Sequence, residues 1–147
     1  MEFITVEQFK EQPKEVQKVF LDWWQPRVWD IFIFNTDEYD NSDSNIGVLA
    51  SLKQISITRR RKGEYRIPLF TEDQLRKFIE DKTNGIVKLI QWNIEDSQVS
   101  KRGYAIDILR KNEYHVTYHY QDLGEDLLQA YWKVACMIAK DEDLNNK

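Results

Sequence analysis

TEDQLRKFIEDKTNGIVKLIQWNI, residues 71–94, places a helix signal directly before a strand signal. Thr71 and Gln74 have the spacing of a capping box, in which each side chain accepts a hydrogen bond from the backbone N–H of the other residue. Apolar residues then recur every three to four positions, and Asn84-Gly85 provides a C-terminal stop. Ile86–Ile94 alternates between two faces, which favours a strand. The stretch therefore predicts a fold that contains both helices and strands.

Two further helices are expected at the start of the chain. Thr5 and Gln8 form a second capping box, which predicts a short helical turn over 6–10. Pro13 is well placed to begin the next helix, because proline lacks only an N–H that the first helical turn leaves unused. Its apolar spacing predicts a helix from 13 to about 23.

The last helix is expected from Leu123 to about Lys140, with Asp122 and Glu125 in the positions of another capping box. Its apolar surface is wider than one stripe. Such a helix is either central to the core or partly covered by a second subunit. The second interpretation predicts a homodimer, with Trp132 and Tyr131 as interface residues.

Strands are expected in the rest of the chain. The expected strands are 29–34, 46–58, 64–69, 86–94, 104–109 and 114–120, with hairpin turns at 60–63 and around 111–112. Short connections of this kind favour antiparallel pairing. The predicted fold class is α+β, an antiparallel sheet of about five to six strands with the N-terminal, central and C-terminal helices packed mainly on one face.

Composition limits the class of protein. The chain has 147 residues, 41% of them apolar, a net charge of −4 and one cysteine. This length suits a single domain over 1–147, with an acidic loop at 35–45 and a frayed tail at 141–147. No apolar run is long enough to span a bilayer, and no export signal is visible. We therefore expect a cytoplasmic protein without a membrane partner.

A basic segment stands out against the negative net charge. Its cations are Arg59, Arg60, Arg61, Lys62 and Arg66. Arginines gathered at a hairpin tip can bind the phosphates of a nucleotide or a nucleic acid. A solvated turn balanced by acidic neighbours is the alternative interpretation.

No catalytic residue, metal site or cofactor is predicted. His115 and His119 have the spacing of a zinc pair on a helix, but their segment alternates as a strand and has no third ligand. The acidic loop at 35–45 lacks the glycine and glutamate of a calcium-binding EF-hand. Cys136 lies among apolar residues, where burial raises the pKa of a thiol.

Two blocks of sequence resemble a known family. They are IPLFTEDQLRKFIEDK at 67–82 and LGEDLLQAYWKVAC at 123–136, with 16–26 adding a weaker likeness. They resemble small phage and prophage proteins of clostridia and related Firmicutes. The resemblance implies a phage accessory protein that acts inside a bacterium, and it assigns no site residues.

Three functions remain open from the sequence. The first is a non-enzymatic binding protein that antagonises a bacterial defence system, by binding a host defence protein or by sequestering a nucleotide signal. The second is an accessory factor that binds DNA or a replication protein through Arg59, Arg60 and Arg61. The third is a small nucleotide-processing enzyme.

Overall fold

The computed structural model describes residues 2–34, 46–61, 66–96, 99–112 and 115–145. It divides into two compact units. The N-terminal unit is Ile4–Phe70, and the C-terminal unit is Met1–Phe3 with Thr71–Lys147. The expected single domain stays a prediction, because a division into compact units does not show that either one folds alone.

The N-terminal unit begins with two helices, α1 (Val6–Lys10) and α2 (Lys14–Trp23). Thr5 and Gln8 form the predicted capping box at the start of α1. Gln17 on α2 is 7% exposed, and its Nε2 donates hydrogen bonds to the backbone oxygens of Lys10 and Gln12. Lys10 is the last residue of α1 and Gln12 follows it closely. One buried amide therefore fixes the second helix against the end of the first.

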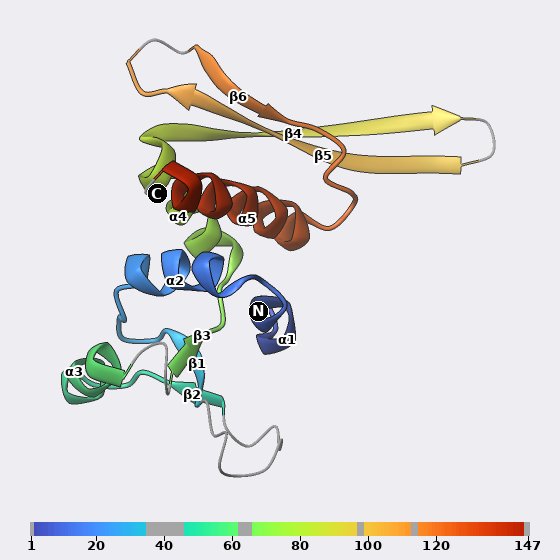
Figure 1. The fold of residues 1–147 in the computed structure, drawn as a ribbon. Helices are drawn as coiled ribbons and strands as arrows, with labels where there is room; N and C mark the ends of the chain where they lie inside the picture. The colour runs from blue at the N-terminus through green and yellow to red at the C-terminus, as the bar shows by residue number, and fades with distance from the viewer. Residues whose placement is uncertain (1, 35–45, 62–65, 97–98, 113–114, 146–147) are drawn as a thin grey trace. The chain divides into compact units, whose positions relative to one another are not determined.

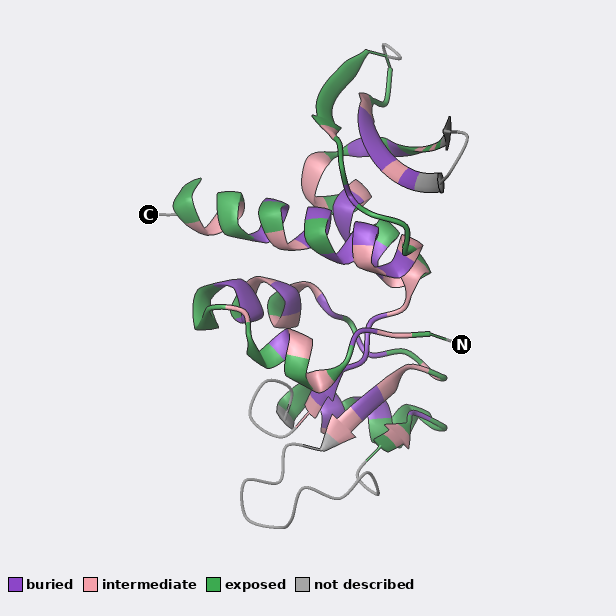
Figure 2. Ribbon diagram, turned by 90° about the vertical axis from the view of Figure 1, so that its right-hand side faces the viewer, coloured by how far each residue is buried: buried purple, intermediate pink, exposed green. Residues whose placement is uncertain are grey.

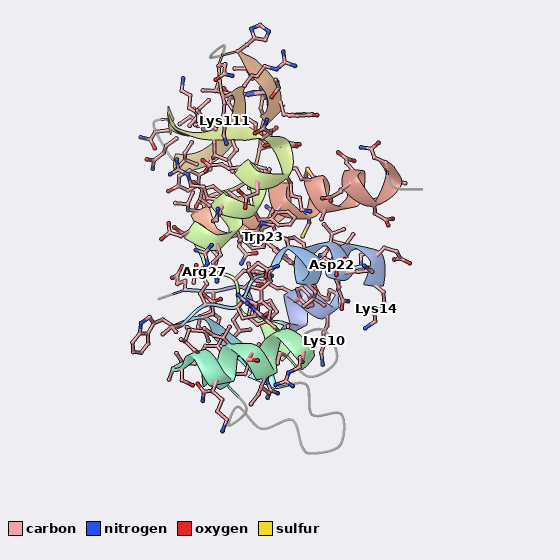
Figure 3. All side chains as sticks on the ribbon, turned by 90° about the vertical axis from the view of Figure 1, so that its left-hand side faces the viewer. Lys10, Lys14, Asp22, Trp23, Arg27 and Lys111 are labelled. Atoms are coloured by element: carbon pink, nitrogen blue, oxygen red, sulfur yellow. The ribbon has the colours of Figure 1, made fainter. Side chains whose placement is uncertain are left out.

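An aromatic cluster forms the core of this unit. Phe20 and Phe70 have ring centroids 5.5 Å apart, and Phe9 lies 6.4 Å from each of them. Trp23 lies 6.2 Å from Phe70, while Lys14, at the start of the same helix, is exposed (Figure 3). Burying several such rings supplies most of the hydrophobic stabilisation of a unit of this size.

Three short strands form the first sheet, in the order β2-β1-β3. They are β1 (Ile31–Phe34), β2 (Ile46–Val48) and β3 (Arg66–Pro68), and both pairings are antiparallel. Phe32 lies opposite Gly47 on one side and Pro68 on the other. The strand predicted at 64–69 therefore pairs with β1, and not with the segment at 46–58.

The strand predicted over 46–58 is wrong beyond Val48, because α3 (Leu52–Arg61) is a helix. Ser51 Oγ accepts a hydrogen bond from the Gln54 N–H at 3.3 Å, and Gln54 Oε1 accepts one from Ala50 N–H at 2.7 Å. This is a variant of the capping arrangement that starts α1. Ile55 and Thr58, three residues apart, form its buried side. Of the hairpin turn predicted at 60–63, residues 60 and 61 belong to the end of this helix, and 62 and 63 lie outside the described residues.

The C-terminal unit contains the second sheet, in the order β4-β5-β6. Its strands are β4 (Gly85–Asp96), β5 (Val99–Arg110) and β6 (Val116–Tyr120), all antiparallel. Before them comes α4 (Glu72–Thr83), which has the predicted capping box and ends at Asn84 in the left-handed conformation, with φ of 49°. Asparagine, rather than the following glycine, thus supplies the left-handed stop.

The last helix, α5 (Leu127–Asn145), begins four residues later than predicted. Asp126, not Asp122, is its cap: the Asp126 carboxylate accepts a hydrogen bond from Gln129 N–H at 2.8 Å. Asp122 and Gly124 have φ of 57° and 89° and belong to the preceding turn. The helix also continues to Asn145, into the tail predicted to fray.

Helices α4 and α5 lie on the same side of the β4-β5-β6 sheet (Figure 1). Ile106 and Ile108 of β5 face them and are completely buried, whereas β6 is exposed over most of its length (Figure 2). The predicted α+β class is confirmed. The single sheet of five to six strands is wrong, because the strands of each unit pair only with one another.

Candidate binding surfaces

The predicted phosphate-binding residues do not form one cradle in the described part of the chain. Arg59 and Arg60 are exposed in the last turn of α3, and Arg60 Nε donates to the Ser56 carbonyl at 3.4 Å. Cations stabilise a helix C-terminus, where carbonyl oxygens concentrate partial negative charge. The side chain of Arg61 and all of Lys62 lie outside the described residues.

Arg66 has a different environment. It lies on β3, half-buried, and its guanidinium carbon is 5.4 Å from the centre of the Phe32 ring. A guanidinium over an aromatic face gains a cation–π attraction within the protein. Arg66 therefore contributes to the packing of the first sheet.

The predicted dimer residues are buried within one chain. Tyr131 and Trp132 are each 5% exposed, and burial is the largest cause of the raised pKa of Tyr131. The wide apolar surface of α5 thus contributes to the core, which was the other interpretation of its sequence. The homodimer itself stays a prediction, which light scattering of concentrated protein tests.

A turn before β1 has an unusual backbone. Asp30 N–H donates to the Arg27 carbonyl at 3.1 Å, which closes a turn over 27–30. Trp29, its third residue, has φ of 79°. Such a φ at this position is typical of a type II turn, where glycine is preferred. A tryptophan there is strained, because its β-carbon crowds the backbone.

The turn is held by a single carboxylate. Asp30 Oδ2 accepts hydrogen bonds from Trp24 Nε1 at 3.0 Å and from Arg27 N–H at 2.9 Å. Trp24 is 1% exposed, so the carboxylate ties the turn to the core of the unit. Trp29 N–H also donates to Leu49 O at 2.6 Å, which joins the turn to the residue after β2.

This geometry exposes a large apolar side chain. Trp29 is 76% exposed, although the sequence predicted it as the first residue of a buried strand. Three more exposed apolar residues lie in the segment to which Trp29 N–H donates: Ile46 and Val48 on β2, just before Leu49, and Leu52 at the start of α3, at 48%, 47% and 80%. We call these four residues the Trp29 surface. No sequence signal marked it, since the turn over 27–30 contains no glycine or asparagine.

The C-terminal unit has a concave region on the sheet face opposite α4 and α5. A cavity of about 380 Å³ is lined by residues that include Ile90, Trp92 and His119. Trp92 lies over Gly103, where an added β-carbon would overlap the indole ring. His119 Nδ1 forms a close contact with Asp107 and its Nε2 another with Gln121.

Chemistry based on metals finds no support in the described ranges. They contain no group of three or more His, Cys, Asp or Glu residues that could hold a metal ion. Burial raises the pKa of the Cys136 thiol from 9.0 to about 12, as the sequence predicted in direction. Among the described helices, none has the length and apolarity that crossing a membrane requires.

No protein-family model, curated protein or solved structure matches this chain. The resemblance to phage proteins therefore stays a prediction, and function has to be inferred from the surfaces themselves.

Proposed function

We propose that this chain is a non-enzymatic binding protein that docks on another protein through the Trp29 surface. The observation that supports the proposal is the 76% exposed indole of Trp29, held in a turn with φ of 79°. Strained backbone persists only where the surrounding structure fixes it, and it concentrates at functional sites.

The surface suits a protein partner better than a nucleotide. Tryptophan is enriched among the residues that dominate protein interfaces. Burying an indole of up to about 250 Å², three quarters of it now exposed, contributes roughly 4 to 5 kcal/mol at 25 cal/mol per Å². The turn already fixes the backbone, so little conformational entropy is lost on binding.

Of the functions left open by the sequence, this surface favours inhibition of a protein over sequestration of a nucleotide signal. The basic residues expected to bind a nucleotide are divided between the end of α3 and the ring of Phe32. With the resemblance to phage proteins, the proposed partner is a protein of a bacterial defence system.

Plaque assays test the proposal. Phages carrying the gene, its Trp29→Ala variant or no gene are plated on hosts that each express one defence system. Leu144→Ala is the matched control, because Leu144 is 61% exposed on α5 in the C-terminal unit. We expect the wild-type gene and Leu144→Ala to restore plaques on at least one defended host, and Trp29→Ala to lose this effect. Absence of rescue on every host, or rescue that Trp29→Ala leaves intact, contradicts the proposal.

A second candidate is DNA binding through α3, which the exposed side chains of Arg59 and Arg60 favour. Phosphate contacts make affinity fall steeply with salt. Gel shifts of duplex DNA with wild-type protein and with Arg59→Gln/Arg60→Gln, at low salt, distinguish it: absence of a shift with the wild type removes this candidate.

A further inference from the structure

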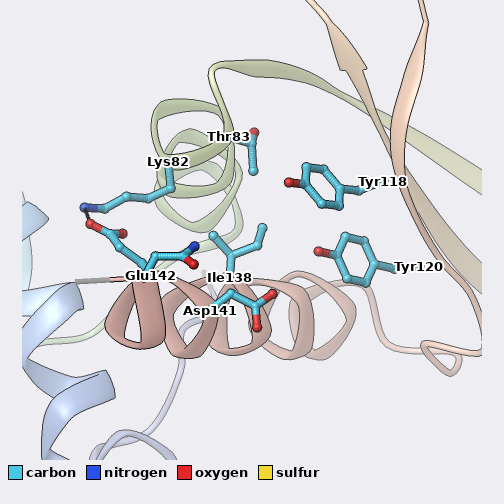
Figure 4. A pocket seen from close by; sticks show the side chains of 8 residues that line it. Lys82, Thr83, Tyr118, Tyr120, Ile138, Asp141 and Glu142 are labelled. Atoms are coloured by element: carbon cyan, nitrogen blue, oxygen red, sulfur yellow. Dashed lines mark hydrogen bonds and ion pairs between the residues drawn. The ribbon is translucent and has the colours of Figure 1, made fainter. Parts of the chain in front are cut away.

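A cavity in the C-terminal unit lies apart from the residues of the proposed function. It is about 220 Å³ in volume and is enclosed by the ends of α4 and α5 and by β6. Tyr118 and Tyr120 project from β6 with their rings stacked, 6.5 Å between centroids and 20° between planes. Their hydroxyl groups point toward Thr83 and Asp141 across the cavity, with Ile138 at its floor (Figure 4).

The charges around the cavity favour a cation. Among the described residues that line it, Lys82 is the only cation, and its ammonium is paired with Glu142 at 2.8 Å and lies 6.0 Å from the centre of the Phe78 ring. The other lining charge is Asp141, for which no ion-pair partner exists in the described part of the chain. The described lining residues therefore have a net charge of −1, which repels phosphate.

The hydrogen-bond directions favour a ligand that donates. The Thr83 hydroxyl donates to the Ile79 carbonyl at 2.7 Å, so its oxygen can only accept from the cavity. Asp141 is an acceptor when ionised. The second carboxylate oxygen of Glu142, Oε2, is buried and has no hydrogen-bond partner in the described part of the chain. A buried acceptor of this kind is stabilised by a donor.

Asp141 also acts on the tyrosine pair. The pKa of Tyr120 is raised by burial first, then by the negative charge of Asp141 and by Tyr118. Its phenol therefore remains neutral at physiological pH and is available as a hydrogen-bond partner, while the ring faces and Ile138 offer apolar contact.

From this arrangement we propose that the cavity binds an alkylammonium group, its three N–H donors facing Asp141 and Thr83 and its methylene stem packed on Ile138 and the tyrosine rings. The volume is below the range of about 300 to 1,000 Å³ that holds drug-sized ligands, so the site takes a group the size of a lysine side chain rather than a whole nucleotide. The source is either a lysine of a partner or a free aliphatic amine.

NMR titration of protein with isotope-labelled tyrosine rings tests the site. The probes are n-butylammonium, n-butanol as its neutral match and adenosine monophosphate. We expect saturable shifts at Tyr118 and Tyr120 with n-butylammonium, binding of n-butanol weaker by about tenfold or more, and no competition by the nucleotide. Equal binding of n-butanol, or displacement by the nucleotide, overturns the proposal.

Two charge-removing variants locate the site. Asp141→Asn is expected to weaken n-butylammonium binding by about tenfold, the lower end of the effect of losing a hydrogen bond between charged groups. Asp73→Asn removes the same charge from the opposite end of α4, where Asp73 is exposed, and is expected to change nothing. Both positions are exposed, so both variants should fold, which circular dichroism verifies. An unchanged affinity in Asp141→Asn refutes the assignment.

The same titration distinguishes the sources. Nα-acetyl-lysine amide, whose side-chain ammonium is free, identifies a partner's lysine if it binds more tightly than n-butylammonium, whereas tighter binding of spermidine identifies a free polyamine. Failure of this site leaves the Trp29 surface untouched, because the two are in different units and have separate assays.

Discussion

Replacing Trp29 with glycine separates the cost of its backbone from the use of its side chain. Only about a quarter of the indole is covered, so losing it removes roughly 60 Å² of buried area, or about 1.5 kcal/mol. Glycine also loses about 0.4 to 1 kcal/mol through the entropy of the unfolded chain. These losses are opposed by a gain of about 1 to 2 kcal/mol, because glycine adopts the positive φ without strain.

These terms largely cancel, so Trp29→Gly should lower the free energy of unfolding by no more than about 1.5 kcal/mol. Trp29→Ala loses the same contacts but keeps the strain, and it should be less stable than Trp29→Gly by about 0.5 to 1 kcal/mol. Trp24→Ala, at a position 1% exposed, should cost about 3 to 5 kcal/mol.

Urea unfolding followed by far-ultraviolet circular dichroism measures all three, since tryptophan fluorescence would change with the substitution itself. Equal stability of Trp29→Gly and Trp29→Ala would show that the turn does not impose a positive φ. A loss of several kcal/mol in Trp29→Gly would show that the indole is a core residue, and the proposed binding surface would then be wrong.

Three further outcomes follow from the C-terminal unit. Gly103→Ala should displace the Trp92 indole, cost about 1 to 3 kcal/mol and shift tryptophan fluorescence to longer wavelength; unchanged emission contradicts the packing. Cys136, with its pKa raised from 9.0 to about 12, should react with a disulfide reagent at pH 8 roughly 10²-fold more slowly than free cysteine until the protein unfolds. The pKa of Tyr120 is raised above its ordinary value of 10.0 in the folded state, so the neutral phenol stabilises the fold. This stabilisation should be lost as the pH rises above 10.0 and through the pKa of the folded state. Asp141→Asn should lower this pKa, as tyrosinate absorbance reports.

Elements that depend on local hydrogen bonds were predictable from the sequence. The capping boxes at Thr5 and Thr71 begin their helices at the predicted residues, because the donors and acceptors are only three positions apart. The hairpin of β5 and β6 was also recovered, since both strands alternate and are joined by a short turn. Each of these signals is contained within a few neighbouring residues.

Errors arose where distant parts of the chain decide the structure. Residues 46–58 were predicted as one strand, although the cap at Ser51 was visible as a spacing of three to Gln54. Strand partners were not predictable, because the same alternating pattern suits one sheet or two.

The candidate sites were harder still. Trp29 depends on Asp30, whose carboxylate reaches the buried Trp24, and nothing in the local sequence indicates a positive φ. The cavity of about 220 Å³, the proposed alkylammonium site, is lined by residues of α4, β6 and α5. These residues are up to 63 positions apart, from Lys82 to Asn145. Convergence of this kind becomes visible only in the folded chain.

The two edges of the first sheet differ in a way that affects how readily the protein aggregates. β3 ends in Pro68, which has no N–H to donate to an added strand, whereas β2 has no proline or charge and exposes Ile46 and Val48. The sheet is thus protected from aggregation at one edge only. Overproduced chain should form edge-to-edge aggregates through β2, and a protein bound at the proposed Trp29 surface should raise the soluble yield when it is co-expressed. For the proposed inhibitor, expression in amounts close to those of its target would avoid this aggregation.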